Sequence, residues 1–82
     1  MDGVPRILSV VPLDGERLRV RFDDGREVVY DCRPLFSRPR FAPLTDPAFF
    51  RLVAVDPGGY GVSWNDEIDL SEYELRTNGV AA

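Results

Sequence analysis

The chain has 82 residues, with 14 acidic and 10 basic side chains and a formal net charge of −4 at pH 7. It contains no histidine, all of its basic residues are arginine, and Cys32 is its single cysteine. This composition excludes histidine-based catalytic triads, lysine nucleophiles, a Walker-A lysine, internal disulfides and cysteine–histidine zinc sites. With 44% hydrophobic residues, it predicts one small globular domain over residues 1–82, with an ordered core at about 5–78.

Charge and hydropathy also limit the expected partners and location. Domains that bind nucleic acids are usually basic, so a negative net charge disfavours that class. No stretch approaches the roughly 18 apolar residues of a membrane span, and the N-terminus lacks the basic and apolar segments of a signal peptide. We therefore expect a cytoplasmic protein without membrane contact.

The first part of the chain predicts two successive hairpins. Residues 7–13 are apolar and β-rich, and they end at an Asp14-Gly15 step that is typical of a hairpin turn. Residues 17–22 alternate arginine with apolar residues, as in a half-buried strand. A turn ending at Gly25 separates this strand from another over residues 26–31.

The register of the second hairpin follows from its side chains. A three-residue loop with a left-handed Gly25 puts apolar residues opposite apolar residues, and arginines opposite acids. A two-residue loop would slip the register by one residue and place Phe22 opposite Glu27, so the longer loop is favoured. The predicted pairs are Phe22–Arg26, Arg21–Glu27, Val20–Val28, Leu18–Tyr30 and Arg17–Asp31.

Proline interrupts the middle of the chain. One helical turn is predicted at 32–36, and residues 38–43 are predicted to be irregular because proline lacks an amide donor. Thr45-Asp46-Pro47 is a helix start for a short helix over 48–52. Residues 53–55 are then expected to return to a strand.

The last third predicts another hairpin followed by a helix. Strands are expected at 53–55 and 60–64, around a Pro-Gly-Gly turn, with Ile68 and Leu70 as a further extended pair. Ser71 and Glu74 match a capping box, so a helix should run to about Thr77 and leave the last residues frayed. This order predicts an α+β domain: an antiparallel meander of about five short strands with one or two short helices.

Several segments, taken together in this order, resemble one bacterial family. They are Pro5-Arg6-Ile7, Leu18-x-Val20-x-Phe22-x-x-Gly25, Tyr30-Asp31 with Pro34-Leu35, Leu44 with Asp46 and Phe49, and Val62-x-Trp64 with Ile68-Asp69-Leu70. The combination is similar to the family catalogued as domain of unknown function 2442, from about Pro5 to Leu75. The resemblance implies a small α+β domain with no established catalytic residues.

The same resemblance implies two kinds of partner. Some longer members carry a helix-turn-helix after this domain, which we expect to be absent from a chain that stops near residue 82. Some short members are encoded beside a second small protein, so the resemblance also implies the partner-binding half of a toxin–antitoxin-like pair.

The candidate partner-binding surface is the proline-broken loop, because loops carry binding residues more often than regular elements do. Its basic and aromatic residues are Arg33, Phe36, Arg38, Arg40 and Phe41. The alternating arginines of residues 17–22 could instead form a nucleic-acid-binding face. Glu27 and Asp31 opposite two of them favour a solvated face of ion pairs.

No catalytic residue, cofactor or metal is assigned. Asp31 is expected to cap the backbone after its strand, Cys32 to be a buried thiol without a base, and Trp64 and Tyr30 to be packing residues. The acids between Asp66 and Glu72 lack the spacing of a calcium loop.

Three hypotheses remain in order of preference. The leading one is a non-catalytic interaction or regulatory module that binds a protein partner or itself, since small domains often gain stability by association. The alternative is a nucleic-acid-associated accessory domain. The weakest is a small enzyme that uses Asp31 or the acids at 66–72.

Overall fold

The computed structural model describes residues 4–14 and 16–82, and its elements form the α+β fold that the sequence predicts. The strands are β1 (Ile7–Leu13), β2 (Arg17–Phe22), β3 (Glu27–Asp31), β4 (Ala54–Val55), β5 (Gly61–Ser63), β6 (Asp69–Ser71) and β7 (Val80–Ala81). The helices are η1 (Arg33–Ser37) and η2 (Pro39–Thr45), both of the 3₁₀ type, and α1 (Pro47–Phe50) and α2 (Glu72–Asn78).

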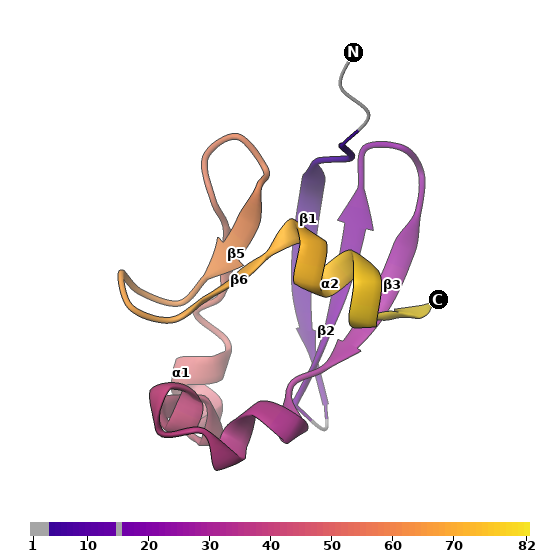
Figure 1. Cartoon of the computed structure of the whole chain (residues 1–82). Coiled ribbons are helices and arrows are strands. Elements are labelled where there is room, and N and C mark those ends of the chain that lie inside the picture. Colours follow the sequence, from indigo (N-terminus) through magenta and orange to yellow (C-terminus); the bar gives the residue numbers. More distant parts are fainter. Residues whose placement is uncertain (1–3, 15) are drawn as a thin grey trace.

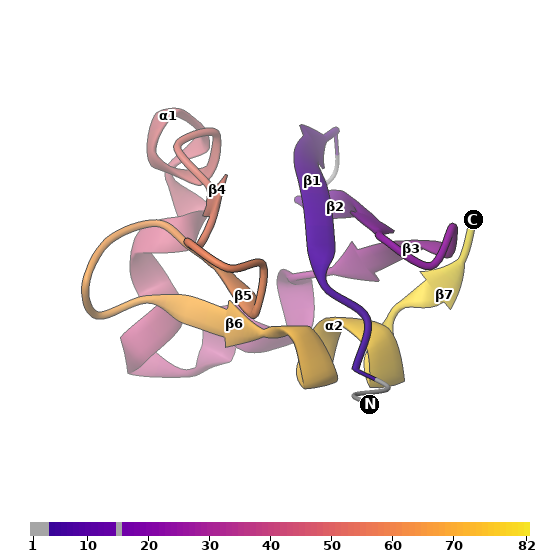
Figure 2. The same cartoon turned by 90° about the horizontal axis from the view of Figure 1, so that it is seen from above.

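The strands form two antiparallel sheets. One sheet has the strand order β1-β2-β3-β7 and the other has the order β4-β5-β6. Figure 1 shows them beside each other, and Figure 2 shows α2 running from the smaller sheet towards β7 of the larger. The Ile7 amide donates to the Gly59 carbonyl at 2.8 Å and so links β1 to the turn before β5. The predicted meander is therefore divided between two sheets, and seven strands are present among the described residues.

The second hairpin has the predicted register. Leu18 lies opposite Tyr30, and Val20 lies opposite Val28. Gly25 has a φ of 89°, the left-handed conformation that the three-residue loop requires. Arg21 forms an ion pair with Glu27 at 3.3 Å. In the first hairpin, Leu13 pairs with Arg17, while Gly15 lies outside the described residues.

Alternation along β2 builds the core. Leu18, Val20 and Phe22 are fully buried, while the arginines between them face solvent. The same core takes in residues from every other part of the chain: Ile7, Val28, Tyr30, Cys32, Leu35, Phe41, Leu44, Phe50, Val62, Trp64, Ile68, Leu70 and Leu75. Both sheets and all the helices thus share one apolar interior.

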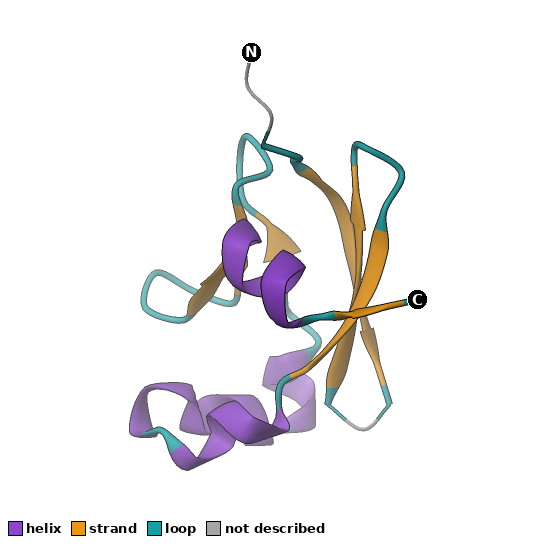
Figure 3. Cartoon of the chain, turned by 45° about the vertical axis from the view of Figure 1, so that its right-hand side comes forward, coloured by secondary structure: helices purple, strands orange, loops and turns teal. Residues whose placement is uncertain are grey.

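Two predictions about irregular structure are wrong. Residues 39–45 form the 3₁₀ helix η2 despite their prolines (Figure 3). Pro39 occupies the first turn, where no amide donor is needed, and the bonds that close the turns come from other residues, as when Phe41 donates to Arg38. At the C-terminus, Val80 and Ala81 pair with Val29 and Val28 instead of fraying.

The short helix α2 begins at the predicted cap. The Ser71 hydroxyl accepts a hydrogen bond from the Glu74 amide at 3.0 Å. The Glu74 carboxylate does not return to Ser71, as a complete capping box would require, but bonds to Tyr30 of β3. No helix in residues 4–14 and 16–82 is long and apolar enough to cross a membrane.

Candidate partner-binding groove

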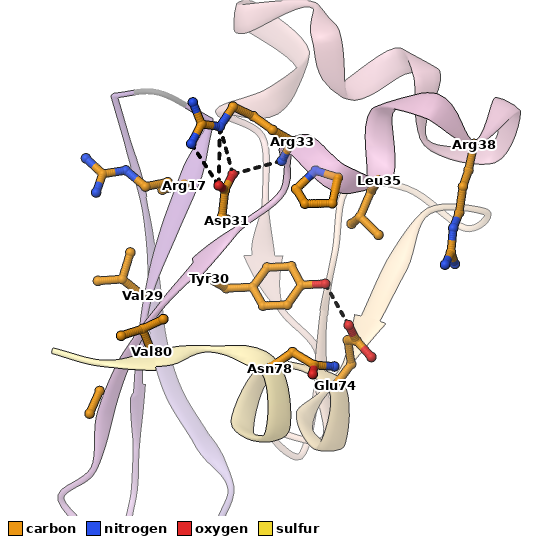
Figure 4. A pocket seen from close by; sticks show the side chains of 12 residues that line it. Arg17, Val29, Tyr30, Asp31, Arg33, Leu35, Arg38, Glu74, Asn78 and Val80 are labelled. Atoms are coloured by element: carbon orange, nitrogen blue, oxygen red, sulfur yellow. Dashed lines mark hydrogen bonds and ion pairs between the residues drawn. The ribbon is translucent and has the colours of Figure 1, made fainter.

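A half-open groove of about 730 Å³ lies between η1, β3, α2 and β7 (Figure 4). We call it the Tyr30 groove, and its lining residues are Arg17, Val29, Tyr30, Asp31, Arg33, Pro34, Leu35, Arg38, Glu74, Asn78, Val80 and Ala81. Another hollow, beside Tyr60, measures about 460 Å³. The Tyr30 groove combines residues from both halves of the chain, which meet because β7 pairs with β3.

Tyr30 crosses the middle of the groove and holds two of its walls together. Its hydroxyl donates to Glu74 Oε2 at 2.7 Å, so the last residues of β3 are tied to the first turn of α2 (Figure 4). The side chain is only 4% exposed. Burial, followed by the hydrogen bond to Glu74, raises the pKa of Tyr30 well above its usual value of 10. The phenol therefore stays protonated and acts as a donor at neutral pH.

Asp31 and Arg33 form a closed pair at one end of the groove. Arg33 Nη2 lies 2.8 Å from Asp31 Oδ2, and the Arg33 backbone amide donates to Asp31 Oδ1 at 3.0 Å. The Arg33 side chain, and then its amide, hold the pKa of Asp31 below its usual value. As predicted, Asp31 accepts a backbone N–H bond directly after its strand, although the N-cap residue of η1 is Cys32. Its carboxylate is ionised and paired with Arg33.

Two other guanidinium groups line the groove without a carboxylate partner. Arg38 makes no ion pair within 4 Å in the described part of the chain, and Figure 4 shows its side chain on the α2 side of η1. Arg17 donates its Nε to the Asp14 carbonyl at 3.3 Å and makes no ion pair within 4 Å in the described residues, but it lies opposite Asp31, and its charge helps to lower the pKa of that carboxyl. The lining thus holds three guanidinium groups and two carboxylates, and both carboxylates are bonded within the chain.

Apolar side chains separate these charged ends. Val29, Pro34, Leu35, Val80 and Ala81 contribute to the lining. Val80 is 71% exposed, although it is a large aliphatic residue in a paired strand. An open groove with apolar walls and a few polar groups is the usual form of a binding site.

The predicted loop residues separate into two groups. Arg33 and Arg38 line the Tyr30 groove. Phe36 is half-buried against the core, and Phe41 is buried with 7% exposure. Arg40 points elsewhere: it donates to the Glu67 carbonyl at 3.0 Å and to Asp69 Oδ1 at 3.2 Å.

The sequence did not reveal the α2 and β7 side of the groove. The sequence pattern places Glu74 in a capping box and Val80 in a frayed end, and neither placement predicts a groove residue. The one available signal was Tyr30, an aromatic residue with a polar tip on a buried strand, because such a hydroxyl needs a partner. Which residue would supply that partner depends on how α2 docks, and spacing does not give this.

The other sequence candidates occupy structural positions. Cys32 is fully buried, and burial followed by the nearby charge of Asp31 raises its pKa to about 12. Trp64 is 7% exposed and donates Nε1–H to the Phe50 carbonyl at 2.9 Å. Both residues thus pack as predicted.

The acids at 66–72 have separate partners. Asp69 pairs with Arg40, while Glu72 pairs with Arg76 at 2.7 Å. In residues 4–14 and 16–82, no three metal-ligating side chains converge. These carboxylates therefore do not form one shared site in the described chain.

Comparison with known proteins adds one family and one solved structure. The profile of the family described as "Protein of unknown function (DUF2442)" matches residues 7–81. A crystal structure of a protein from Nitrosomonas europaea, named a "putative DNA binding protein", is similar with a TM-score of 0.68 and 28% sequence identity. The match covers 77% of the present chain and 41% of that protein. No curated protein matches the chain.

Proposed function

The chain belongs to the DUF2442 family of proteins of unknown function, and from that premise we propose that it is a non-catalytic protein-interaction module. Its binding surface is the Tyr30 groove. This proposal keeps the protein-binding interpretation of the sequence and moves the surface from the whole proline-broken loop to the part of it that faces β3, α2 and β7.

The observation that carries the proposal is the state of the groove's polar groups. Both carboxylates in the lining are bonded to internal donors, Asp31 to Arg33 and Glu74 to Tyr30. A general base needs a carboxylate that can reach a substrate proton. The groove instead exposes guanidinium groups and the aliphatic side chain of Val80 to solvent. Arginine and apolar side chains are common in protein-binding interfaces.

Selection from a library of displayed random peptides tests this function. We expect the selected peptides to bind the wild-type protein, and we expect Val80→Asp to weaken that binding because it puts a charge on the apolar wall. Leu52→Asp is the matched control, since Leu52 is 64% exposed and does not line the groove. Peptides that bind the two variants equally well, or a library that yields no binder, would refute the proposal.

A second candidate function is nucleic-acid binding. The solved relative from Nitrosomonas europaea is named a putative DNA binding protein, although the matched region is less than half of it. On the present chain, Arg17, Arg19 and Arg21 form a row of exposed residues along β2. Glu27 pairs with Arg21, and Asp31 lies opposite Arg17, so acids interrupt this row.

Salt dependence separates this candidate from the first. If the arginine row bound a DNA duplex, the affinity would fall steeply with salt because phosphate contacts release counterions. The substitution Arg19→Gln would weaken it, since Arg19 lies opposite the apolar Val11 and Val29 and has no acid across from it. No binding at low salt would remove this candidate.

A further inference from the structure

We infer that the Tyr30 groove receives an acidic, extended segment of a partner protein, with one carboxylate of that segment against Arg38 and an apolar side chain against the exposed Val80. The inference rests on the proposed function and names the chemistry of the partner. It follows from charge, from the shape of the sheet edge and from the lack of an exposed aromatic ring in the groove.

Charge is the first argument. The whole chain has a net charge of −4, yet the groove lining holds more guanidinium groups than carboxylates. Asp31 lies between Arg33 and Arg17, and Glu74 keeps its charge because the phenol bonded to it is neutral. The lining therefore has an excess of one guanidinium, and Arg38, which makes no ion pair within 4 Å in the described part of the chain, is the group available to a partner. Arginine binds carboxylates through paired, charge-assisted hydrogen bonds. An acidic segment therefore complements this groove, whereas a basic one would be repelled.

The sheet edge favours an extended partner. β7 pairs only with Val28 and Val29, while β3 runs on to Asp31. The end of β3 therefore extends past its short neighbour and borders the groove. In an extended peptide, alternate side chains point the same way, so acidic and apolar residues can be directed to different walls. Arg38 on η1 and Val80 on β7 supply those walls from two elements.

The groove is poorly suited to a nucleic-acid strand. Single strands bind through bases stacked on aromatic rings, together with phosphates held by basic groups. Tyr30 is the one aromatic residue of the lining, and with 4% exposure it offers no stacking surface. The exposed aliphatic side chain of Val80 would also gain nothing from a phosphate chain. These features favour a peptide.

Titration with synthetic peptides tests the inference. The probes are fluorescein-labelled peptides in which Glu alternates with Leu, together with matched peptides that carry Gln or Lys in place of Glu. The protein variants are Arg38→Gln and Arg51→Gln. Arg51 is exposed and lies outside the groove, so its variant removes the same charge elsewhere. Equal thermal unfolding of the two variants verifies that both are folded.

We expect the Glu peptide to bind more tightly than the Gln peptide and far more tightly than the Lys peptide, with an affinity that falls as salt is added. We expect Arg38→Gln to weaken the Glu peptide by roughly tenfold, the usual effect of one charged hydrogen bond. Arg51→Gln should leave that affinity within about twofold. Amide chemical shifts should change along β3, η1 and β7.

The remaining outcomes overturn the inference in distinguishable ways. Equal binding of all three peptides, lost in Val80→Asp, rejects the acidic partner but leaves the groove as a protein-binding surface. Displacement of the Glu peptide by free succinate at similar concentration makes the groove a small-carboxylate site. Both the inference and the proposed function fail if neither the displayed random peptides nor the synthetic peptides bind at the groove. They also fail if a DNA duplex binds there instead.

Discussion

Replacing Tyr30 with Phe tests whether one hydrogen bond holds α2 against β3. The substitution removes the hydroxyl that donates to Glu74 Oε2 at 2.7 Å and keeps the buried ring. A hydrogen bond to a charged group contributes about 1.5 to 3 kcal/mol. Glu74 is half-buried and regains water when the bond is lost, so the lower value applies. We expect Tyr30→Phe to lower the free energy of unfolding by about 1.5 kcal/mol, and Tm by about 6 to 12 °C for a domain of this size.

Urea and thermal denaturation measure this change. Tyr60→Phe is the control, because Tyr60 is 55% exposed and its hydroxyl makes no hydrogen bond in the described part of the chain. It should change stability by less than about 0.5 kcal/mol. A double-mutant cycle with Glu74→Ala should return a coupling energy of about 1 kcal/mol. A Tyr30→Phe protein as stable as the wild type would show that packing alone docks α2, and the groove would lose its central support.

Three further predictions concern stability. Burial raises the pKa of Cys32 from 9 to about 12, so the folded thiol keeps its proton at pH values where the unfolded one ionises. The stability this provides is fully present below pH 9 and falls by about 1.4 kcal/mol per pH unit between pH 9 and about 12. Alkaline urea titrations should therefore show a flatter decline for Cys32→Ala, and equal slopes would contradict the reasoning. Gly79→Ala should lower the free energy of unfolding by about 1 to 3 kcal/mol, because its Cβ would lie 2.7 Å from Val28 Cγ2 in a packed interior. A Tm equal to that of the wild type would contradict this prediction and show that β7 can shift without loss of stability. Arg21→Gln should change the free energy of unfolding by less than about 0.5 kcal/mol, since the ion pair between Arg21 and Glu27 is solvent-exposed. A loss of more than about 1 kcal/mol would contradict this prediction.

Local patterns were sufficient for the β2–β3 hairpin. Its strands alternate with period two, and a one-residue slip would bury Glu27 in place of Val28, so only one register satisfies both faces. The N-cap of α2 was predictable for the same reason, because Ser71 and Glu74 lie within one turn. In both cases the decisive contacts join residues that are close in the sequence.

The division into two sheets and the strand β7 depend on contacts between distant residues. Val80 and Ala81 have no pattern of their own, and they form a strand because β3 offers an unpaired edge. Gly79 permits the approach: its φ is −75°, so the residue is needed for space against Val28 and not for a left-handed turn. From the sequence, a glycine after a helix predicts only that the helix ends there. It does not tell whether the glycine forms a left-handed turn or leaves space for a neighbouring strand.

The groove is the place where these distant contacts decide function. Arg33 and Arg38 could be singled out from the sequence, but whether each is available depends on its neighbours. Asp31 binds Arg33 from two residues away; its bond from the Arg33 amide was predictable, and its ion pair with the Arg33 side chain was not predicted. Glu74 of α2 lies in the same groove, where its carboxylate accepts a hydrogen bond from Tyr30, 44 residues away in the chain. Which charges meet in the groove is therefore set by contacts between distant residues, and the arginine count of the loop alone does not give it.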